Sequence, residues 1–283
     1  MDPFKEIEEV YIDTNGIKLH TIVIGSGEPL ILLHGFPEFW YCWKSVIPGL
    51  KEKFKLIIPD MRGYNLSDKP KDVQKYKMEY LIGDIEGLIE NLKLKQVYLA
   101  GHDWGGVVAW ALAEKHPELL KKLIILNAPH PKIFQKSLRT VKKQQEASSY
   151  IFAFLKPNAE KKLYEDDYRR LKKAVFEDMI NKTNFTEFDK EKYIEAWSQP
   201  GALLGGVNYY RANTSFDEWT GIIEVPTLVI WGMKDVALLP QQLEGLSDYV
   251  KNLKIIRSEN SSHWIANDDS DLIVSSIKEF VLD

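Results

Sequence analysis

The sequence predicts an α/β protein in which short buried strands alternate with helices around a largely parallel sheet. Six apolar runs are too short for helices and fit strands buried on both faces, as in parallel sheets. These runs are residues 30–34, 56–59, 97–101, 123–127, 227–232 and 254–258. Amphipathic stretches such as 80–92 lie between them, so we expect crossover helices to join the strands.

The chain opens with a predicted β-hairpin. Its two strand-like runs flank Asn15 and Gly16, a dipeptide favoured in two-residue turns where both residues have positive φ. Further along, helices are predicted at 107–116, which Pro117 ends, and at 268–281. The acidic residues that open the second of these suit the positive end of a helix dipole.

One long region breaks the alternation. Between about residues 132 and 217 no strand-like run appears, and the segment holds 16 Lys and Arg against 12 Asp and Glu. We therefore predict a helical insertion at 132–217 in a core formed by residues 1–131 and 218–283. Insertions that follow a sheet strand often act as lids over a site at the strand ends.

Composition excludes several classes of protein. The 283 residues carry 37 Lys and Arg against 41 Asp and Glu, which argues against a nucleic-acid binder. A lone cysteine, Cys42, and six dispersed histidines predict no metal and no cofactor. No apolar run approaches the roughly 18 residues of a membrane span, and the N-terminus lacks a signal sequence, so we expect a cytoplasmic location. The apolar residues of the insertion leave a homodimer open.

The most informative motif lies between the strand at 97–101 and the helix at 107–116. It reads Gly101-His102-Asp103-Trp104-Gly105, the pattern of a nucleophile elbow with Asp103 at the serine position. Alone, the motif fits an ordinary glycine-rich turn equally well. A carboxylate is ionised at neutral pH and suits displacement of a leaving group from a saturated carbon, which produces an alkyl ester. Hydrolysis of that ester requires a base and an oxyanion hole.

Two residues after later strands can complete this chemistry. His263 follows the strand at 254–258 as the candidate base, and Asp235 follows 227–232 as the acid that orients it. Asn127, at the competing position, cannot supply a carboxylate. Asp235 also fits an ordinary turn, and His263 also fits the start of a helix. The order of nucleophile, acid and histidine along the chain nevertheless favours catalysis.

The oxyanion hole is expected from two backbone N–H groups. The loop His34-Gly35-Phe36-Pro37 follows a strand, so the N–H of Phe36 can point into the site together with that of Trp104. An ordinary strand-to-loop turn is the alternative reading of this motif.

Motifs spread over nearly the whole chain carry a family resemblance. The segments HGFP, PDMRGYNLSDKP, GHDWGG, NAPHP, GMKD and SSHW resemble the α/β-hydrolase superfamily and, within it, the soluble epoxide hydrolases. The resemblance implies a mostly parallel eight-stranded sheet with a helical cap, and an enzyme that opens a small apolar or aromatic epoxide with water to a vicinal diol. Asn65 departs from the family, which usually has glycine there.

The resemblance also implies two cap tyrosines that hydrogen-bond the epoxide oxygen. Tyr150 matches the first, and Tyr210, just before Arg211, matches the second, with Tyr209 as the adjacent alternative. A phenol is protonated at neutral pH, so two of them can polarise the ring oxygen while Asp103 attacks carbon. Simple packing in the lid is the competing explanation. We expect the shape of the pocket to depend on six aromatic residues: Phe36, Phe39, Trp40, Phe152, Phe154 and Trp264.

The main rival is a haloalkane or haloacetate dehalogenase with the same Asp-His-Asp machinery. The indole of Trp104 could bind halide, but Phe36 stands where many haloalkane dehalogenases carry Asn. Tyr150 and Ile151 stand where a fluoroacetate dehalogenase would carry a His-Trp pair. An esterase is disfavoured by Asp103, and a non-catalytic receptor by the intact nucleophile, acid and base.

Overall fold

A single sheet of eight strands forms the centre of the computed structural model, which describes residues 4, 6–183 and 185–282. The strands are β1 (Glu8–Thr14), β2 (Ile17–Ile24), β3 (Glu28–Leu33), β4 (Phe54–Pro59), β5 (Val97–His102), β6 (Leu120–Leu126), β7 (Thr227–Gly232) and β8 (Leu253–Ser258). Their order across the sheet is β1-β2-β4-β3-β5-β6-β7-β8, and β3 to β8 run parallel. The predicted fold class and the mostly parallel sheet are therefore confirmed.

The predicted hairpin forms the antiparallel edge of the sheet. β1 pairs with β2 around Asn15 and Gly16, whose φ values of 45° and 76° are both positive. The Asn15 side chain donates to the carbonyl of Tyr80, which ties the turn to the helix behind it. The dipeptide therefore determines the turn type and also anchors the hairpin.

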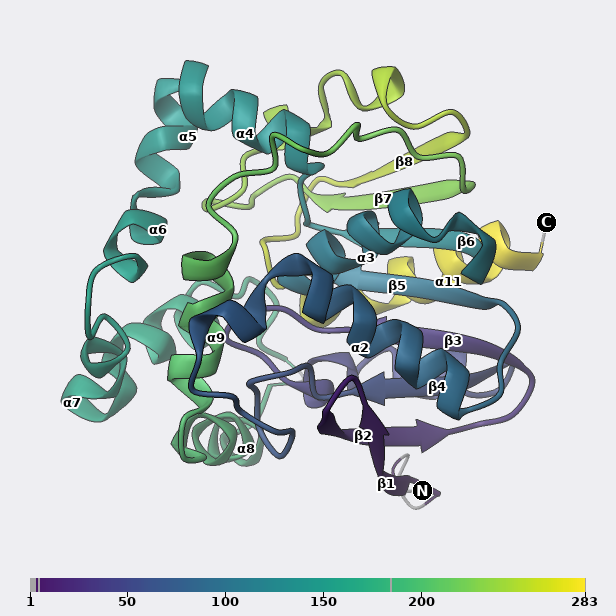
Figure 1. Ribbon diagram of the computed structural model, residues 1–283, viewed down its shortest axis with the longest axis horizontal. Helices are drawn as coiled ribbons and strands as arrows, with labels where there is room; N and C mark the ends of the chain where they lie inside the picture. The colour runs from purple at the N-terminus through teal and green to yellow at the C-terminus, as the bar shows by residue number, and fades with distance from the viewer. Residues whose placement is uncertain (1–3, 5, 184, 283) are drawn as a thin grey trace.

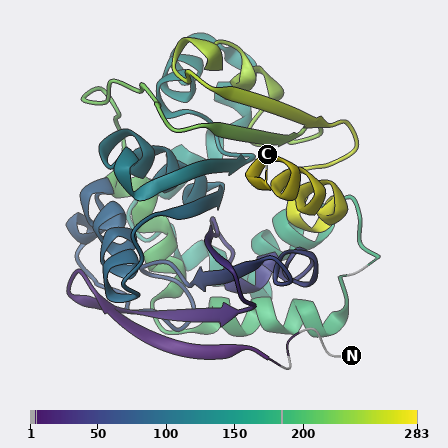
Figure 2. The same ribbon diagram turned by 90° about the vertical axis from the view of Figure 1, so that its right-hand side faces the viewer.

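Helices cover both faces of the sheet (Figure 2). The core helices are α1 (Ile47–Leu50), α2 (Met78–Asn91), α3 (Trp104–Lys115), α10 (Ile265–Asp268) and α11 (Ser270–Leu282), with 3₁₀ turns at Trp40–Trp43, Val73–Tyr76, Pro117–Leu119, Pro240–Leu243 and Leu246–Asp248. One core cluster joins the sheet to α2 and α3, and a second joins it to α1 and α11. The three helices predicted for the core are present, and α3 begins three residues early, directly after Asp103.

The predicted insertion, 132–217, lies within the longer segment between β6 and β7, residues 127–226, and from here on the insertion means this whole segment. Its helices are α4 (Pro131–Thr140), α5 (Lys142–Ala147), α6 (Ser149–Phe154), α7 (Lys161–Lys172), α8 (Glu187–Ser198) and α9 (Ala202–Ala212), with a π-helical turn at Lys173–Glu177. Among its described residues, β-structure is limited to one isolated bridge from Ile223 to Val250. Figure 1 shows these helices on the left, beyond the ends of the parallel strands.

The insertion is less regular than the core. Inside α7 the chain leaves helical geometry, and Asp166, Asp167 and Tyr168 adopt φ values of 50°, 54° and 59°. Three consecutive non-glycine residues in the left-handed region carry backbone strain. α8, by contrast, begins with a capping box in which Thr186 and Asp189 bond each other's backbone N–H.

Within the described part of the chain, no helix combines the length and the apolar character needed to cross a membrane.

Candidate active site

Asp103 occupies a sharp turn between β5 and α3. Its φ of 49° and ψ of −122° form a conformation that few non-glycine residues adopt. Glycines make the turn possible, because a Cβ on Gly105 would lie 2.4 Å from the Leu33 carbonyl oxygen and one on Gly101 would lie 2.4 Å from the Gly105 oxygen. The strand-turn-helix elbow expected from the motif is therefore present, with the carboxylate above the ends of the parallel strands.

The loop after β3 reaches the same carboxylate. Asp103 Oδ1 accepts the backbone N–H of Phe36 at 2.8 Å. Gly35 allows this approach, since a Cβ there would lie 2.3 Å from Oδ1. Burial raises the pKa of Asp103, against the opposing charges of His263 and His102. The N–H groups of Phe36 and Trp104 lower that pKa, so both face the carboxylate as the sequence-based expectation requires.

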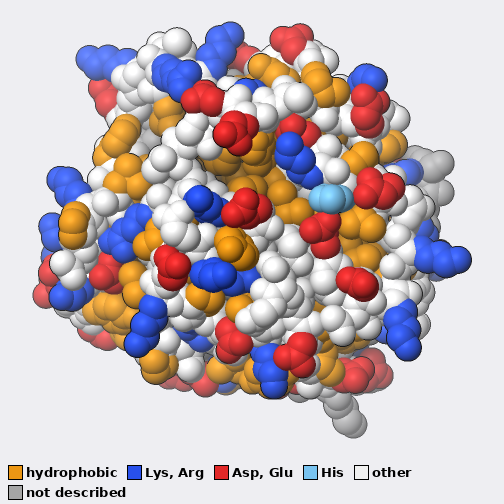
Figure 3. All heavy atoms as spheres, in the orientation of Figure 1, with side chains coloured by type: hydrophobic (Ala, Val, Ile, Leu, Met, Phe, Trp, Pro, Cys, Tyr) orange, Lys and Arg blue, Asp and Glu red, His pale blue; other side chains and the backbone are white. Residues whose placement is uncertain are grey.

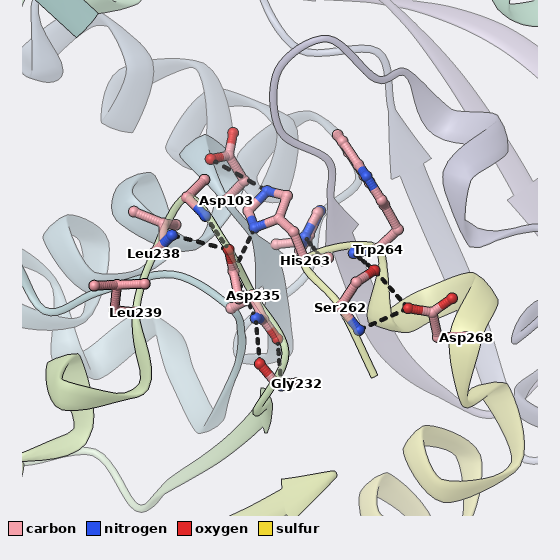
Figure 4. Close-up of polar contacts among 12 residues, drawn as sticks. Asp103, Gly232, Asp235, Leu238, Leu239, Ser262, His263, Trp264 and Asp268 are labelled. Carbon is pink, nitrogen blue, oxygen red and sulfur yellow. Dashed lines mark hydrogen bonds and ion pairs between the residues drawn. The ribbon is translucent and has the colours of Figure 1, made fainter. Parts of the chain in front are cut away.

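His263 lies between the two aspartates (Figure 4). Its Nδ1 is 2.7 Å from Asp235 Oδ2, and its Nε2 is 3.7 Å from Asp103 Oδ2. Burial lowers the pKa of His263, but the charge and hydrogen bond of Asp235 and the charge of Asp103 outweigh it and raise the pKa to about 9. At neutral pH the imidazole is therefore protonated on both nitrogens, and its positive charge balances the neighbouring carboxylates.

Asp235 is fixed by donors from its own loop and from the residue that follows β6. Its Oδ1 accepts the N–H groups of Ala237 and Leu238 at 2.9 and 2.8 Å, and its Oδ2 accepts Asn127 Nδ2 at 2.8 Å. Asn127, which was excluded as the acid because it lacks a carboxylate, thus orients the carboxylate of Asp235. Its position at the end of the strand between those of Asp103 and Asp235 was the signal available for this role.

A buried pair, Glu38 and His102, contacts the backbone of His263. His102 Nδ1 is 2.8 Å from Glu38 Oε2, and its Nε2 is 2.9 Å from the backbone carbonyl oxygen of His263. Burial would raise the pKa of Glu38, but the charge of His102 and its hydrogen bond lower it. Sequence reasoning missed Glu38, although an acidic residue directly after the HGFP motif was visible.

Two tyrosines of the insertion face the carboxylate. Tyr150 lies on α6 and Tyr210 on α9, and their rings meet edge to face with centroids 6.1 Å apart. The Tyr210 ring also lies 5.0 Å from that of Trp104. Burial, with the charge of Asp103 nearby, raises the pKa of both hydroxyls, so they remain protonated donors at neutral pH.

The adjacent tyrosine points elsewhere. Tyr209 is completely buried, and its hydroxyl donates to the carbonyl of Arg62 at 2.8 Å, in the loop after β4. Tyr210, rather than Tyr209, therefore lies against the pocket that contains Asp103.

That pocket encloses about 150 Å³ between the core and the insertion. Figure 3 shows a hollow lined by apolar side chains and bordered by charged ones. Besides Asp103, Tyr150 and Tyr210, the pocket is lined mainly by apolar side chains, among them Trp104, Val107, Pro129, Pro131, Phe134, Leu138, Ile151, Phe152, Leu155, Phe216 and Leu238. Phe134 and Leu138 are four residues apart on α4, so helical spacing was the signal that could have found them.

Of the six aromatic residues expected to shape this pocket, only Phe152 is among its lining residues. Phe39 stacks on Tyr41 and Trp40 packs edge-on against Phe39, whereas Phe154 packs behind Phe36 and Tyr210. Trp264 lies against His263 and donates its indole N–H to Ala174. Aromatic content alone did not distinguish side chains that line the cavity from those that support its walls.

Asn65 stands at a turn position where the family that the sequence resembles usually has glycine. The residue has a φ of 38°, and its side-chain amide donates to Asp60 Oδ2 at 2.7 Å. Asn is among the non-glycine residues that tolerate this conformation best, so the turn is retained. The other Asp60 oxygen accepts the N–H of Trp40, which links the turn to the loop after β3.

Among the described residues, no cluster of three His, Cys, Asp or Glu side chains could hold a metal ion. What the geometry does offer is a carboxylate nucleophile, an imidazole paired with a second carboxylate, two backbone N–H donors and two phenols around one apolar pocket. This set suits displacement at carbon followed by ester hydrolysis.

Known proteins resemble this chain in both sequence and structure. Residues 28–269 match the family described as the alpha/beta hydrolase fold. Epoxide hydrolase 1 of Caenorhabditis elegans is 36% identical, covering 96% of this chain and 69% of the relative. The AB hydrolase superfamily protein YfhM of Bacillus subtilis is 40% identical over 96% of both chains. The crystal structure of a Bacillus megaterium epoxide hydrolase in complex with an inhibitor superimposes with a TM-score of 0.91 at 33% identity, covering 97% of this chain and 100% of that one.

Proposed function

The chain belongs to the α/β-hydrolase family and is an epoxide hydrolase, and we propose that Asp103 performs the reaction as a covalent nucleophile. The observation that carries the proposal is one apolar pocket that brings a carboxylate at a nucleophile elbow together with two phenols. The insertion then acts as the cap that supplies those phenols.

In the first step, Asp103 attacks a ring carbon of the epoxide. Its Oδ1 is occupied by the N–H of Phe36, so Oδ2 is the oxygen available to form the new C–O bond. The bond from that carbon to the ring oxygen breaks, and the electron pair moves to the oxygen. Tyr150 and Tyr210 donate hydrogen bonds to the developing alkoxide, and one of them transfers a proton to give the hydroxyl group. The product is a hydroxyalkyl ester of Asp103.

In the second step, water attacks the carbonyl carbon of the ester. His263 accepts a proton from the water while Asp235 holds its ring through Nδ1. The tetrahedral oxyanion forms where Oδ1 lies, against the N–H groups of Phe36 and Trp104. When it collapses, the bond from the Asp103 carboxyl carbon to the alkyl oxygen breaks, and the leaving alkoxide takes the proton of the new carboxyl group to give the diol. The proton on His263 then returns to the tyrosinate, and Asp103 is a carboxylate again.

The protonation state of His263 suits this sequence of steps. In the free enzyme the charges of Asp235 and Asp103 help to raise its pKa to about 9. Ester formation removes the charge of Asp103, so the pKa of His263 falls and the neutral imidazole needed as a base becomes more populated. The first step thereby prepares the base for the second.

Small apolar or aromatic epoxides are the substrate class that fits the pocket lining. A solved structure of a mutant of the Bacillus megaterium enzyme, 32% identical to this chain, is complexed with its product (R)-3-[1]naphthyloxy-propane-1,2-diol. Dehalogenation is the alternative activity, but a halide accepts hydrogen bonds and needs no proton. Two phenols beside the nucleophile therefore favour an epoxide oxygen as the leaving group.

A single-turnover experiment in H₂¹⁸O tests the mechanism. With enzyme in excess over styrene oxide, we expect ¹⁸O in the Asp103 peptide and ¹⁶O in the diol, because water attacks the ester and not the substrate. Replacement of His263 by Gln should leave the ester attached, visible as added mass on the same peptide. Labelled diol in the first turnover would rule out the covalent route, and halide release from 1-chlorobutane without diol from styrene oxide would rule out the substrate class.

A further inference from the structure

Asp268 lies at the end of α10, five residues after the proposed base His263. One of its carboxylate oxygens, Oδ2, accepts both the backbone N–H of Ser262 at 2.7 Å and the hydroxyl of Ser262 at 2.5 Å (Figure 4). Ser262 directly precedes His263, and its hydroxyl oxygen accepts the N–H of Trp264 at 3.2 Å. Asp268 Oδ2 and the Ser262 hydroxyl therefore fix the backbone on both sides of His263.

The other oxygen of Asp268 belongs to a different part of the molecule. Oδ1 accepts the backbone N–H groups of Ile180 and Asn181 at 2.9 and 2.8 Å, and the Asn181 side chain donates to the Asp268 carbonyl at 3.3 Å. Both residues belong to the insertion, just after its π-helical turn. One carboxylate with four donors thus joins the insertion to the loop that carries His263.

Trp264 forms a second connection between the same two segments. Its indole N–H donates to the carbonyl of Ala174 at 2.8 Å. Ala174 lies in the π-helical turn Lys173–Glu177, where the chain leaves the helix and carbonyls need partners from outside it. The Trp264 ring is buried and lies edge to face with the His263 ring, with centroids 4.9 Å apart. Both residues that flank His263 are therefore attached, directly or through Asp268, to residues 174–181 of the insertion.

We propose that Asp268 is a positioning residue for the ester-hydrolysis step. It couples the position of the insertion on the core to the orientation of His263. We call the contacts of Asp268 with Ser262, Ile180 and Asn181 the Asp268 bridge. The inference rests on the proposed function, in which His263 acts only in the second step. Alkylation uses Asp103 and the two tyrosines, none of which the bridge contacts.

The two half-reactions therefore separate this role from a general structural one. A base displaced by a fraction of an ångström loses its alignment with the attacking water, and misplacement by about 1 Å can lower a rate by about 100-fold. The bridge should influence how fast the ester disappears and leave its rate of formation unchanged. A segment that only stabilises the fold would change both rates, or neither.

Asp268→Asn is the sharpest test, because it keeps the size of the side chain and removes one acceptor. Whichever way the amide is oriented, its NH₂ group faces either the Ser262 donors or the two N–H groups of the insertion. We expect hydrolysis of the Asp103 ester to slow by about 10-fold to 100-fold, with ester formation within about twofold of wild type. Rapid quench of single turnovers with styrene oxide, followed by mass measurement of the Asp103 peptide, gives both rates.

Trp264→Phe provides a second variant, since it removes the indole N–H and keeps an aromatic ring against His263. It should slow hydrolysis in the same direction and by less. Asp271→Asn, three residues farther on with an exposed side chain, is the matched control and should leave both rates unchanged.

Three outcomes would overturn the Asp268 bridge as a positioning device. One is wild-type ester hydrolysis in Asp268→Asn, and the second is an equal fall of both rates. The third is a wild-type enzyme that forms no ester on Asp103, which rejects the proposed function and the bridge together. The first two leave the proposed function intact.

Discussion

The two sides of the active site are held in place by different kinds of structure. On the core side, Asp103, Asp235 and His263 follow the ends of parallel strands, and backbone N–H groups hold both carboxylates at 2.8–2.9 Å. On the insertion side, Tyr150 and Tyr210 lie on helices, and aromatic rings pack around them. Directional hydrogen bonds define a position more narrowly than ring packing does.

This difference suggests a division of labour. In the proposed mechanism the core holds the groups whose bonds change, and small displacements there are expected to reduce rates steeply. The insertion provides the hydroxyl donors and most of the apolar lining, which set the substrate that fits. It also carries the strained residues 166–168 and the π-helical turn, which have no counterpart in the regular strands of the core.

The largest effect is expected on the core side, from Asp103→Asn. The amide cannot form the ester, so we expect kcat/KM for epoxide opening to fall by at least about 1,000-fold. Substrate depletion followed by chromatography gives the rate, and the melting temperature should change little. Asp13→Asn, an exposed change on β1, is the control, and substantial turnover by Asp103→Asn would contradict the role given to the core.

On the insertion side, removal of one hydroxyl should have a smaller effect. Tyr150→Phe and Tyr210→Phe are each expected to slow ester formation by about 100-fold, since each removes one donor to the developing alkoxide. Tyr209→Phe is the matched control, because its hydroxyl bonds the Arg62 carbonyl. That change should lower the free energy of unfolding by about 1 kcal/mol and leave ester formation intact. Unchanged rates in both pocket variants would reduce the tyrosines to packing groups.

The pH dependence of the two steps should differ as well. His263 has a pKa raised to about 9 in the free enzyme, and loss of the Asp103 charge in the ester lowers that value. Hydrolysis needs the neutral imidazole, so below the lowered pKa its rate should fall by about tenfold for each unit of pH. Ester formation needs no neutral imidazole, so the ester should accumulate as the pH falls, until the buried Asp103, whose pKa is raised, becomes protonated in the free enzyme. Mass measurement of the Asp103 peptide at steady state between about pH 5 and pH 8 tests this, and a constant ester fraction would argue against His263 as the base.

Glycines in the two regions should differ in their tolerance of a methyl group. At Gly105 the new Cβ would lie 2.4 Å from the backbone oxygen of Leu33, and we expect a loss of about 3 kcal/mol in unfolding free energy together with loss of activity. At Gly201, before α9, the nearest atom is 3.7 Å away and only the φ of 85° is unfavourable, so a loss of about 1 kcal/mol with retained activity is expected. Denaturant unfolding of both alanine variants measures the difference, and equal losses would contradict the contrast.

The smallest effect concerns the strained part of α7. Asp166→Gly should raise the free energy of unfolding by about 0.5 kcal/mol, because relief of the left-handed conformation exceeds the added entropy of the unfolded chain. Glu191→Gly, at an exposed and regular position of α8, is the control and should lower it by about 1 kcal/mol. If Asp166→Gly destabilised the protein as much as the control, the local strain would be absent.

Much of the core could be predicted because its patterns are local. The apolar runs, the Asn15-Gly16 turn and the helices of the core follow from side-chain periodicity and turn chemistry, and all are present. The order of Asp103, Asp235 and His263 along the chain was sufficient to anticipate that they meet, because the carboxyl ends of parallel strands share one edge of a sheet.

The supporting residues could not be predicted in the same way. Each of three such residues has a hydrogen-bond partner in a distant segment of the chain: Asn127, Glu38 and Asp268. The residues next to them in the sequence do not indicate which distant residue that partner is. The pocket lining was also misjudged, since Phe39 and Trp264 support its surroundings while Phe134 and Leu138 face the cavity.

By itself, the sequence determined the chemistry that this chain can perform. A carboxylate at an elbow, a histidine and a second carboxylate are properties of residue type and of their order along strands. The tertiary structure decided which tyrosine faces that carboxylate, which side chains enclose the substrate, and how the insertion is connected to the base. All three depend on the directions in which the helices of the insertion point their side chains toward the ends of the strands. Contacts between distant segments leave no periodic pattern in the sequence, so the sequence alone does not reveal them.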